Sequence, residues 1–191
     1  MRRFDELDLE NTLTEEYAPL IMALSDCPIP TVCAVNGIAA GAGASLALAA
    51  DITIAARSAS FLLAFARIGL IPDAGATWWL PRRTGMARAM GMALLAEPVT
   101  AARALDWGLI WEVTEDGDLY GRAAELAGKL ANGPTAAYAR IKQAMRASLA
   151  NGLEEQLALE ARLQGEAGQT HDFREGVMAF LEKRPPAFRG E

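Results

Sequence analysis

Residues 30–51 read PTVCAVNGIAAGAGASLALAAD. Within them, Thr31–Val35 is short, uncharged and rich in β-branched residues, which predicts a strand buried on both faces. Alanine and leucine dominate Ala44–Ala50, which predicts a helix, and Asp51–Ala55 predicts a second strand. A strand, a glycine-rich loop, a helix and a strand in this order predict an α/β body.

Further elements extend this body in both directions. The residue pattern predicts a helix over Leu13–Leu24 capped by Asn11 or Thr12, a short strand over Phe61–Phe65, a loop over Gly69–Thr77, and helices over Arg82–Leu95, Thr100–Gly108 and Thr135–Leu149. Thr170 is the expected cap of a last helix. We therefore expect an α/β core over residues 1–133 and a helical region over residues 134–191.

The composition excludes several classes of function. The 191 residues are 52% hydrophobic, which supports one packed domain core and argues against disorder. The formal net charge is −6, so a general attraction to nucleic acid or to an anionic membrane is not expected. A ligand that carries phosphate groups would therefore need local basic residues.

Three features bear on the cellular compartment. The stretch Cys27–Ala50 has no charged residue, but its prolines and many alanines argue against a membrane span. Acidic residues such as Asp5 and Glu6 stand close to the start of the chain, which lacks the apolar core of a signal peptide. Cys27 and Cys33 match neither a redox pair nor a metal site. We therefore expect two buried, reduced cysteines, no bound metal and a cytoplasmic protein.

The segment Gly41-Ala42-Gly43-Ala44-Ser45 lies where a loop becomes a helix. Free backbone N–H groups and the positive end of the helix dipole point the same way at such a place, which makes an anion site. Glycines also let an oxygen atom approach the backbone, as an oxyanion hole requires. The alternative is that these small residues only allow the helix to pack tightly.

Asp73 lies in the turn sequence Ile71-Pro72-Asp73-Ala74-Gly75, among apolar residues. A carboxylate walled by residues such as Phe65 and Trp78 would have a raised pKa and could act as a proton shuttle. The alternative is an ordinary turn aspartate, because Pro-Asp-x-Gly is common turn chemistry. The single histidine, His171, is expected at the surface, and no Ser-His-Asp set is present.

Four runs resemble the signature of the crotonase superfamily of acyl-CoA enzymes. They are residues 30–51, quoted above, residues 68–77 (IGLIPDAGAT), residues 101–110 (AARALDWGLI) and residues 173–190 (FREGVMAFLEKRPPAFRG). Nearly the whole chain is covered by the resemblance. It implies a ββα superhelix with a C-terminal helical extension that forms trimers, and it favours the functional interpretations of the glycine loop and of Asp73.

In this family an acyl-CoA binds with its thioester oxygen at two backbone N–H groups, which stabilise an enolate. The resemblance implies that Ala42 supplies one donor and that Gly41 and Gly43 shape its loop. Hydratase members carry two glutamates, at the positions of Ser45 and Phe65, so hydration is disfavoured. Isomerase members carry an acid where this chain has Asp73. The implied enzyme is thus an isomerase with Asp73 as its proton shuttle, and with no cofactor beyond the coenzyme A of its substrate.

Runs such as residues 39–44 (AAGAGA), 54–59 (IAARSA) and 107–111 (WGLIW) resemble one branch of these isomerases. That branch converts ring-1,2-epoxyphenylacetyl-CoA to an oxepin in phenylacetate breakdown, and a shift of a 3-enoyl-CoA double bond to the 2-position is a related reaction. A wall made by Leu62, Leu63, Phe65 and Trp78 would suit an aromatic acyl group. The alternatives are an enoyl-CoA hydratase of fatty-acid oxidation and an impaired member that acts as an interaction subunit.

The expected substrate-binding residues are Gly41, Gly43, Ser45, Phe65, Ile71, Trp78, Lys183 and Arg189. Lys183 and Arg189, together with Arg184, are candidate contacts for CoA phosphates, with a solvated basic tail as the alternative. The family implies a homotrimer or a hexamer of two trimers. Family members also carry first strands and a second oxyanion donor ahead of the region matched here, so the chain is expected to be N-terminally truncated and impaired in activity.

Overall fold

The computed structural model describes residues 8–191. The acidic positions on which the signal-peptide argument rests, Asp5 and Glu6, lie outside the described residues. The chain forms two compact units. One unit holds the residues up to Cys27 together with Thr31–Ala123, and the other holds Pro28–Pro30 together with Ala124–Glu191. The expected domain boundary between residues 133 and 134 stays a prediction.

Two small sheets form the β part of the first unit. Strands β1 (Val32–Val35), β3 (Ile52–Ala56) and β6 (Glu112–Thr114) make one parallel sheet in the order β1-β3-β6. Strands β2 (Ile38–Ala40), β4 (Ser60–Leu62) and β5 (Val99–Thr100) make the other, in which β2 and β4 are parallel and β5 is antiparallel to β4. The strands predicted over Thr31–Val35 and Asp51–Ala55 are confirmed.

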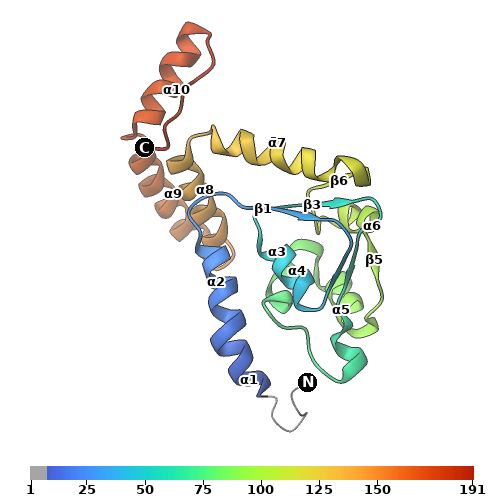
Figure 1. Ribbon diagram of the computed structural model, residues 1–191. Helices are drawn as coiled ribbons and strands as arrows, with labels where there is room; N and C mark the ends of the chain where they lie inside the picture. Colours follow the sequence, from blue (N-terminus) through green and yellow to red (C-terminus); the bar gives the residue numbers. More distant parts are fainter. Residues whose placement is uncertain (1–7) are drawn as a thin grey trace. The chain divides into compact units, whose positions relative to one another are not determined.

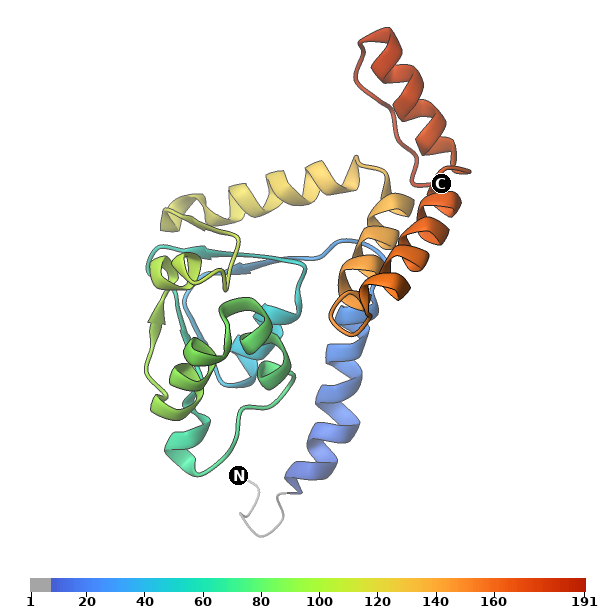
Figure 2. The ribbon, with the colours of Figure 1, turned by 180° about the vertical axis from the view of Figure 1, so that it is seen from behind.

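Successive strands along the first part of the chain alternate between the two sheets. It runs through β1 and β2, then through helix α3 (Ala42–Ala49), and returns through β3 and β4. Residues Val32–Val35 pair with Ile52–Ala55, and Ile38–Ala40 pair with Ser60–Leu62. Figure 1 shows β1 and β3 side by side, and the view from behind in Figure 2 shows the helices that accompany them. The repeated unit is therefore two strands and a helix.

Several predicted elements begin or end elsewhere. The strand predicted over Phe61–Phe65 gives way after Leu62 to the 3₁₀ helix η3 (Ala64–Ile68). The loop predicted over Gly69–Thr77 ends early, because helix α4 begins at Ala76 and runs to Thr84. Gly85, with φ of 77°, then separates α4 from α5 (Met86–Leu95), so the single helix predicted over Arg82–Leu95 was wrong. A positive φ interrupts the helical hydrogen bonds, and glycine adopts it freely.

The N-terminal helix starts before the predicted position. Asp8 is its cap, because its side chain accepts a hydrogen bond of 2.9 Å from the Asn11 N–H, so the caps predicted at Asn11 or Thr12 were wrong. The helix continues as α1 (Leu9–Thr12), the π-helical turn η2 (Leu13–Tyr17) and α2 (Ala18–Asp26).

The remaining helices follow the expected order. They are α6 (Ala101–Asp106), η4 (Asp116–Asp118), α7 (Leu119–Ala131), α8 (Thr135–Ala147), α9 (Leu153–Ala167) and α10 (His171–Glu182). Thr100 and Thr170 are confirmed as caps, because their hydroxyls accept hydrogen bonds from the N–H groups of Arg103 and Phe173, at 3.3 and 3.1 Å. Among the described helices, none is long and apolar enough to cross a membrane.

The core of the first unit lies where the strands meet α3 and α4. Its largest fully buried side chains include Phe61, Leu48, Ile54, Leu63 and Leu80. Strand β1 was expected to be buried on both faces, but only its last residue, Val35, is buried. The reason is that β1 lies at the edge of its sheet, where it has one strand neighbour among the described residues. Cys27 and Cys33 are free thiols, as predicted, but both are only partly buried, so the expectation that they are buried was wrong.

Candidate active site

The glycine loop before α3 leaves backbone donors unpaired. Gly41 adopts φ of 54° and ψ of −128°, which strongly favours glycine. Its N–H donates to the Leu62 carbonyl at 2.8 Å, and its own carbonyl accepts from the N–H groups of Ala44 and Ser45. A helix leaves its first N–H groups without intrahelical acceptors, and here these belong to Ala42 and Gly43. Two donors at the positive end of α3 are thus available for an oxyanion.

A cavity of about 700 Å³ lies in front of this loop, within the first unit. Both Ala42 and Asp73 line it. Its other lining residues are Leu9, Thr12, Leu13, Tyr17, Ala18, Ile21, Met22, Leu70, Ile71, Pro72, Ala74 and Gly75. Most of these side chains are apolar, which is typical of small-molecule sites in which a few polar groups fix the ligand. Ala42 and Asp73 therefore line one partly open, mostly apolar cavity.

The backbone around Asp73 is tightly held. The Asp73 carbonyl accepts hydrogen bonds from the Ala76 N–H at 2.9 Å and from the Ser45 hydroxyl at 2.8 Å. The next two residues, Ala74 and Gly75, have φ of 49° and 85°. A β-carbon on Gly75 would also lie 2.9 Å from Trp79 Nε1, so the site excludes a side chain there for two reasons.

The Asp73 carboxylate lies in a desolvating environment. Its Oδ1 atom is buried and has no hydrogen-bond partner among the described residues. Burial raises the pKa of Asp73 above its ordinary value of 3.8, and a hydrogen bond from its own backbone partly offsets this effect. A carboxyl group that takes up a proton more readily than usual is suited to accept a proton and return it.

Two predicted substrate-binding residues lie behind the cavity wall. Ser45 is fully buried, and its hydroxyl donates a hydrogen bond to the Asp73 carbonyl. Phe65 is also buried, and its Cζ atom lies 3.7 Å from the place that a β-carbon of Gly41 would take. The structure thus puts both residues directly behind the loop and the acid, where they support the backbone.

The other predicted residues of the first unit differ in whether they line the cavity. Ile71 lines the cavity, and Gly43 is exposed at the start of α3. Trp78 is not among the lining residues, and the Arg82 guanidinium lies over its ring at 4.2 Å from the centroid. Leu62 and Leu63, predicted with Phe65 and Trp78 to form the acyl wall, are also absent from the lining. The wall is built instead by α1, η2 and α2 and by residues 70–75.

The helix itself was predicted over Leu13–Leu24, but sequence reasoning missed its place in the cavity wall. A signal for it exists, since the cavity-lining positions Leu9, Leu13, Ala18 and Met22 are spaced by four, five and four residues. The spacing of five belongs to a wide helical turn, and a search for the regular helical period of 3.6 does not find it.

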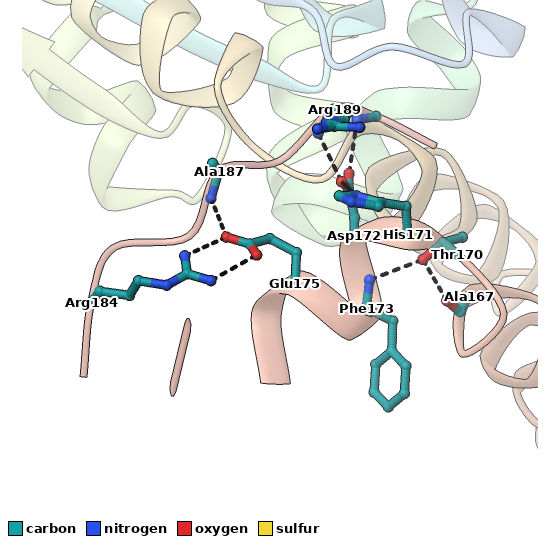
Figure 3. Close-up of polar contacts among 10 residues, drawn as sticks. Ala167, Thr170, His171, Asp172, Phe173, Glu175, Arg184, Ala187 and Arg189 are labelled. Atoms are coloured by element: carbon teal, nitrogen blue, oxygen red, sulfur yellow. Dashed lines mark hydrogen bonds and ion pairs between the residues drawn. The ribbon is translucent and has the colours of Figure 1, made fainter. Parts of the chain in front are cut away.

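The basic residues predicted for CoA phosphates lie in the second unit. The Arg189 N–H donates to Asp172 Oδ1 at 2.7 Å, and the Gly190 N–H donates to Oδ2 at 2.8 Å, which ties the C-terminal tail to α10 (Figure 3). Lys183 follows α10 with φ of 54°. The side chains of Lys183 and Arg189 are exposed and form no ion pair within the described chain.

Arg184, between them, is engaged differently. Its guanidinium pairs with Glu175 at 2.6 Å and with Glu182 at 2.6 Å. The first of these contacts appears in Figure 3, where Glu175 also accepts the Ala187 N–H. Hydrogen bonds from Arg184 and from the Ala187 backbone lower the pKa of Glu175 to about 2. Arg184 is therefore a structural residue of the tail, and the unpaired cations are Lys183 and Arg189.

Comparisons with known proteins decide the family. A family model for enoyl-CoA hydratase/isomerase matches residues 3–191. The chain belongs to this family, the crotonase superfamily. A protein of Rhodobacter capsulatus named "Probable enoyl-CoA hydratase" is 62% identical over 184 residues, which cover 96% of this chain and 72% of that relative. The 1,2-epoxyphenylacetyl-CoA isomerase of Escherichia coli is 52% identical, over 96% of this chain and 70% of that relative.

Solved structures of the family agree with the fold. An enoyl-CoA hydratase/isomerase from Cupriavidus metallidurans matches with a TM-score of 0.90 at 35% identity, over 98% of this chain and 71% of that one. An enoyl-CoA hydratase from Bacillus anthracis matches with a TM-score of 0.92 at 32% identity, over 98% of this chain and 73% of that one. The predicted α/β crotonase-like fold is thus confirmed, while the expected truncation and trimerisation stay predictions.

Proposed function

We propose that this member of the enoyl-CoA hydratase/isomerase family is an acyl-CoA isomerase that works through a thioester enolate. The observation that carries the proposal is that Ala42, with its unpaired N–H, and Asp73, with its raised pKa, line the same cavity. In this proposal the Ala42 N–H donates to the thioester oxygen, and the Asp73 carboxylate faces the carbons of the acyl chain.

The reaction moves one proton. The Asp73 carboxylate takes a proton from carbon 2 of a 3-enoyl thioester, and the electron pair passes into a dienolate whose charge is on the thioester oxygen. The Ala42 N–H and the dipole of α3 stabilise that charge. Protonated Asp73 then returns the proton to carbon 4, which leaves the double bond at carbon 2. No atom is gained or lost, so no cofactor is required beyond the CoA carried by the substrate.

The set of carboxylates favours isomerisation over hydration. Within the described residues, Asp73 is the only carboxylate that lines the cavity. Addition of water by the hydratase members uses two glutamates, and the positions that correspond to them hold Ser45 and Phe65. Neither side chain can act as a carboxylate, and both are buried behind the wall. Hydratase activity remains the second candidate, because the relative at 62% identity is named for it.

For the acyl group we propose the ring-1,2-epoxide of phenylacetyl-CoA, which isomerises to an oxepin, with simple 3-enoyl-CoAs as related substrates. The support is the 52% identity to the isomerase of Escherichia coli and the mostly apolar cavity of about 700 Å³. Lys183 and Arg189 are proposed to contact CoA phosphates within a homotrimer or a hexamer of trimers, since their side chains are exposed cations.

The test compares the purified protein with its Asp73→Asn variant. Formation of 2-enoyl-CoA from 3-hexenoyl-CoA and turnover of the ring epoxide are followed, together with deuterium uptake at carbon 2 in D₂O. We expect Asp73→Asn to lower all three rates by about a hundredfold or more, and Asp106→Asn, at an exposed carboxylate of α6, to leave them unchanged. Hydration of 2-butenoyl-CoA faster than isomerisation, or wild-type rates in Asp73→Asn, would contradict the proposal.

A further inference from the structure

The cavity wall contributed by the N-terminal helix contains an irregular turn. Residues Leu13–Tyr17 form the π-helical turn η2, between the α-helical segments α1 and α2. Such a turn holds one residue more than an α-helical turn, and short π-helical segments occur often at functional sites. Leu13 and Tyr17, the first and last residues of η2, both line the cavity.

The extra residue decides which side chains face the cavity. In an uninterrupted α-helix the face that carries Leu9 and Leu13 continues with Glu16, Tyr17 and Leu20, because the same face returns after three or four residues. With the wide turn it continues with Tyr17, Ala18, Ile21 and Met22, which are the residues that line the cavity. Glu16 and Leu20 are exposed and lie outside the lining. The π-helical turn thus keeps the Glu16 carboxylate out of the cavity and brings Ala18 and Met22 to the wall beside Tyr17, which follows Leu13 by four residues.

The phenol of Tyr17 has an unused hydrogen-bonding group. No described residue forms a hydrogen bond with the Tyr17 hydroxyl, and the hydroxyl is not among the buried atoms that lack a partner. The hydroxyl is therefore accessible and free to donate. Among the lining residues that the structure describes, the other polar side chains are Thr12 and Asp73. A hydrocarbon acyl group that filled the cavity would cover this donor without pairing it, whereas an acyl group with an oxygen atom would pair it.

We propose that Tyr17 is a specificity-determining residue, which donates a hydrogen bond to an oxygen atom of the acyl group and so selects oxygen-bearing acyl-CoAs over hydrocarbon ones. The inference rests on the proposed function, because it takes this cavity to be the acyl site. It adds a residue and a substrate property: the ring oxygen is recognised by the phenol, at a wall separate from the acid and the oxyanion donor.

The experiment measures binding, so that it does not depend on turnover. Dissociation constants of phenylacetyl-CoA and 2-hydroxyphenylacetyl-CoA are determined by calorimetry for the wild type and for Tyr17→Phe. The second thioester carries an oxygen at the ring position next to the side chain. We expect the wild type to prefer it, and Tyr17→Phe to weaken its binding about tenfold while phenylacetyl-CoA binds as before. Tyr138→Phe, in the second unit, is the matched control and should change neither constant.

A wild type with no preference for the oxygen-bearing thioester, including one that binds neither thioester, would overturn the inference, and so would a Tyr17→Phe variant that keeps the preference. If Thr12→Val removed the preference and Tyr17→Phe did not, the recognition would belong to the Thr12 hydroxyl, and the inference would also be overturned. The proposed function is separable from this result. Asp73→Asn should lower isomerisation about a hundredfold or more and leave the binding preference intact, whereas Tyr17→Phe should remove the binding preference.

Discussion

Replacing Ser45 by alanine removes a single hydrogen bond that joins α3 to the proposed proton shuttle, Asp73. The Ser45 hydroxyl donates to the Asp73 carbonyl at 2.8 Å from a fully buried position on α3. In the variant the carbonyl keeps only its bond from the Ala76 N–H at 2.9 Å. A neutral buried hydrogen bond contributes about 1 kcal/mol. If that free energy holds Asp73 in its working position, its loss corresponds to about a fivefold fall in kcat, since about 1.4 kcal/mol equals tenfold.

The assay separates positioning from stability. Steady-state isomerisation of 3-hexenoyl-CoA gives kcat and KM, and urea unfolding gives the free energy of unfolding. Thr53→Val is the matched control, because the Thr53 hydroxyl is equally buried and donates to the Ala47 carbonyl of the same helix at 2.7 Å, without contact to Asp73. Both variants should lose about 1 kcal/mol of stability, but only Ser45→Ala should lose kcat, with KM nearly unchanged. Equal losses of kcat in both variants, or none in Ser45→Ala, would refute the reasoning.

Three further predictions concern single residues. Burial raises the pKa of Asp73, and the proposed isomerisation needs its carboxylate, so kcat should fall with decreasing pH at an inflection above 3.8. The raised pKa also means that ionised Asp73 is less favourable in the folded protein than in the unfolded chain. Asp73→Asn should therefore raise the melting temperature at pH 7. Gly75→Ala should cost about 1–3 kcal/mol in urea unfolding, because of its φ of 85° and of Trp79 Nε1 at 2.9 Å, whereas Gly91→Ala, with open space around it in α5, should not destabilise. Glu175, whose pKa is lowered to about 2, contributes stability above its ordinary value of 4.5 that is lost as the pH falls toward 2, so the Ala187 amide should lose hydrogen-exchange protection over that range, and Glu175→Gln should show no such loss.

The parts of the site that the sequence predicts are those encoded in short, contiguous runs. The glycine loop and the turn at Asp73 each need particular backbone angles, and glycines at positions 41 and 75 mark them. The resemblance of these runs to the crotonase superfamily implied that Ala42 and Asp73 share one site, and the structure puts both at one cavity. Helices with strong caps, at Thr100 and Thr170, were found for the same reason.

The parts that escaped prediction depend on contacts between distant segments. Strands β5 and β6 are only two and three residues long, and they exist because Val99 pairs with Phe61 and Val113 pairs with Ala55. No local pattern announces so short a strand. Likewise, the wall formed by the N-terminal helix depends on a π-helical turn, whose wide spacing looks like a break in periodicity.

Helix α3 is anchored at both ends to the segment that carries Asp73 and α4. At its start, Ser45 holds the Asp73 carbonyl. At its end, the Arg83 guanidinium of α4 donates to the carbonyls of Leu48 and Ala50 at 2.7 and 3.0 Å, which satisfies acceptors that a helix terminus leaves unpaired. Since α4 begins three residues after Asp73, these two anchors fix both the position and the direction of α3 relative to the acid. Ala42 and Asp73 are therefore held relative to each other by hydrogen bonds at both ends of α3, as the proposed transfer of a proton beside a developing enolate would require.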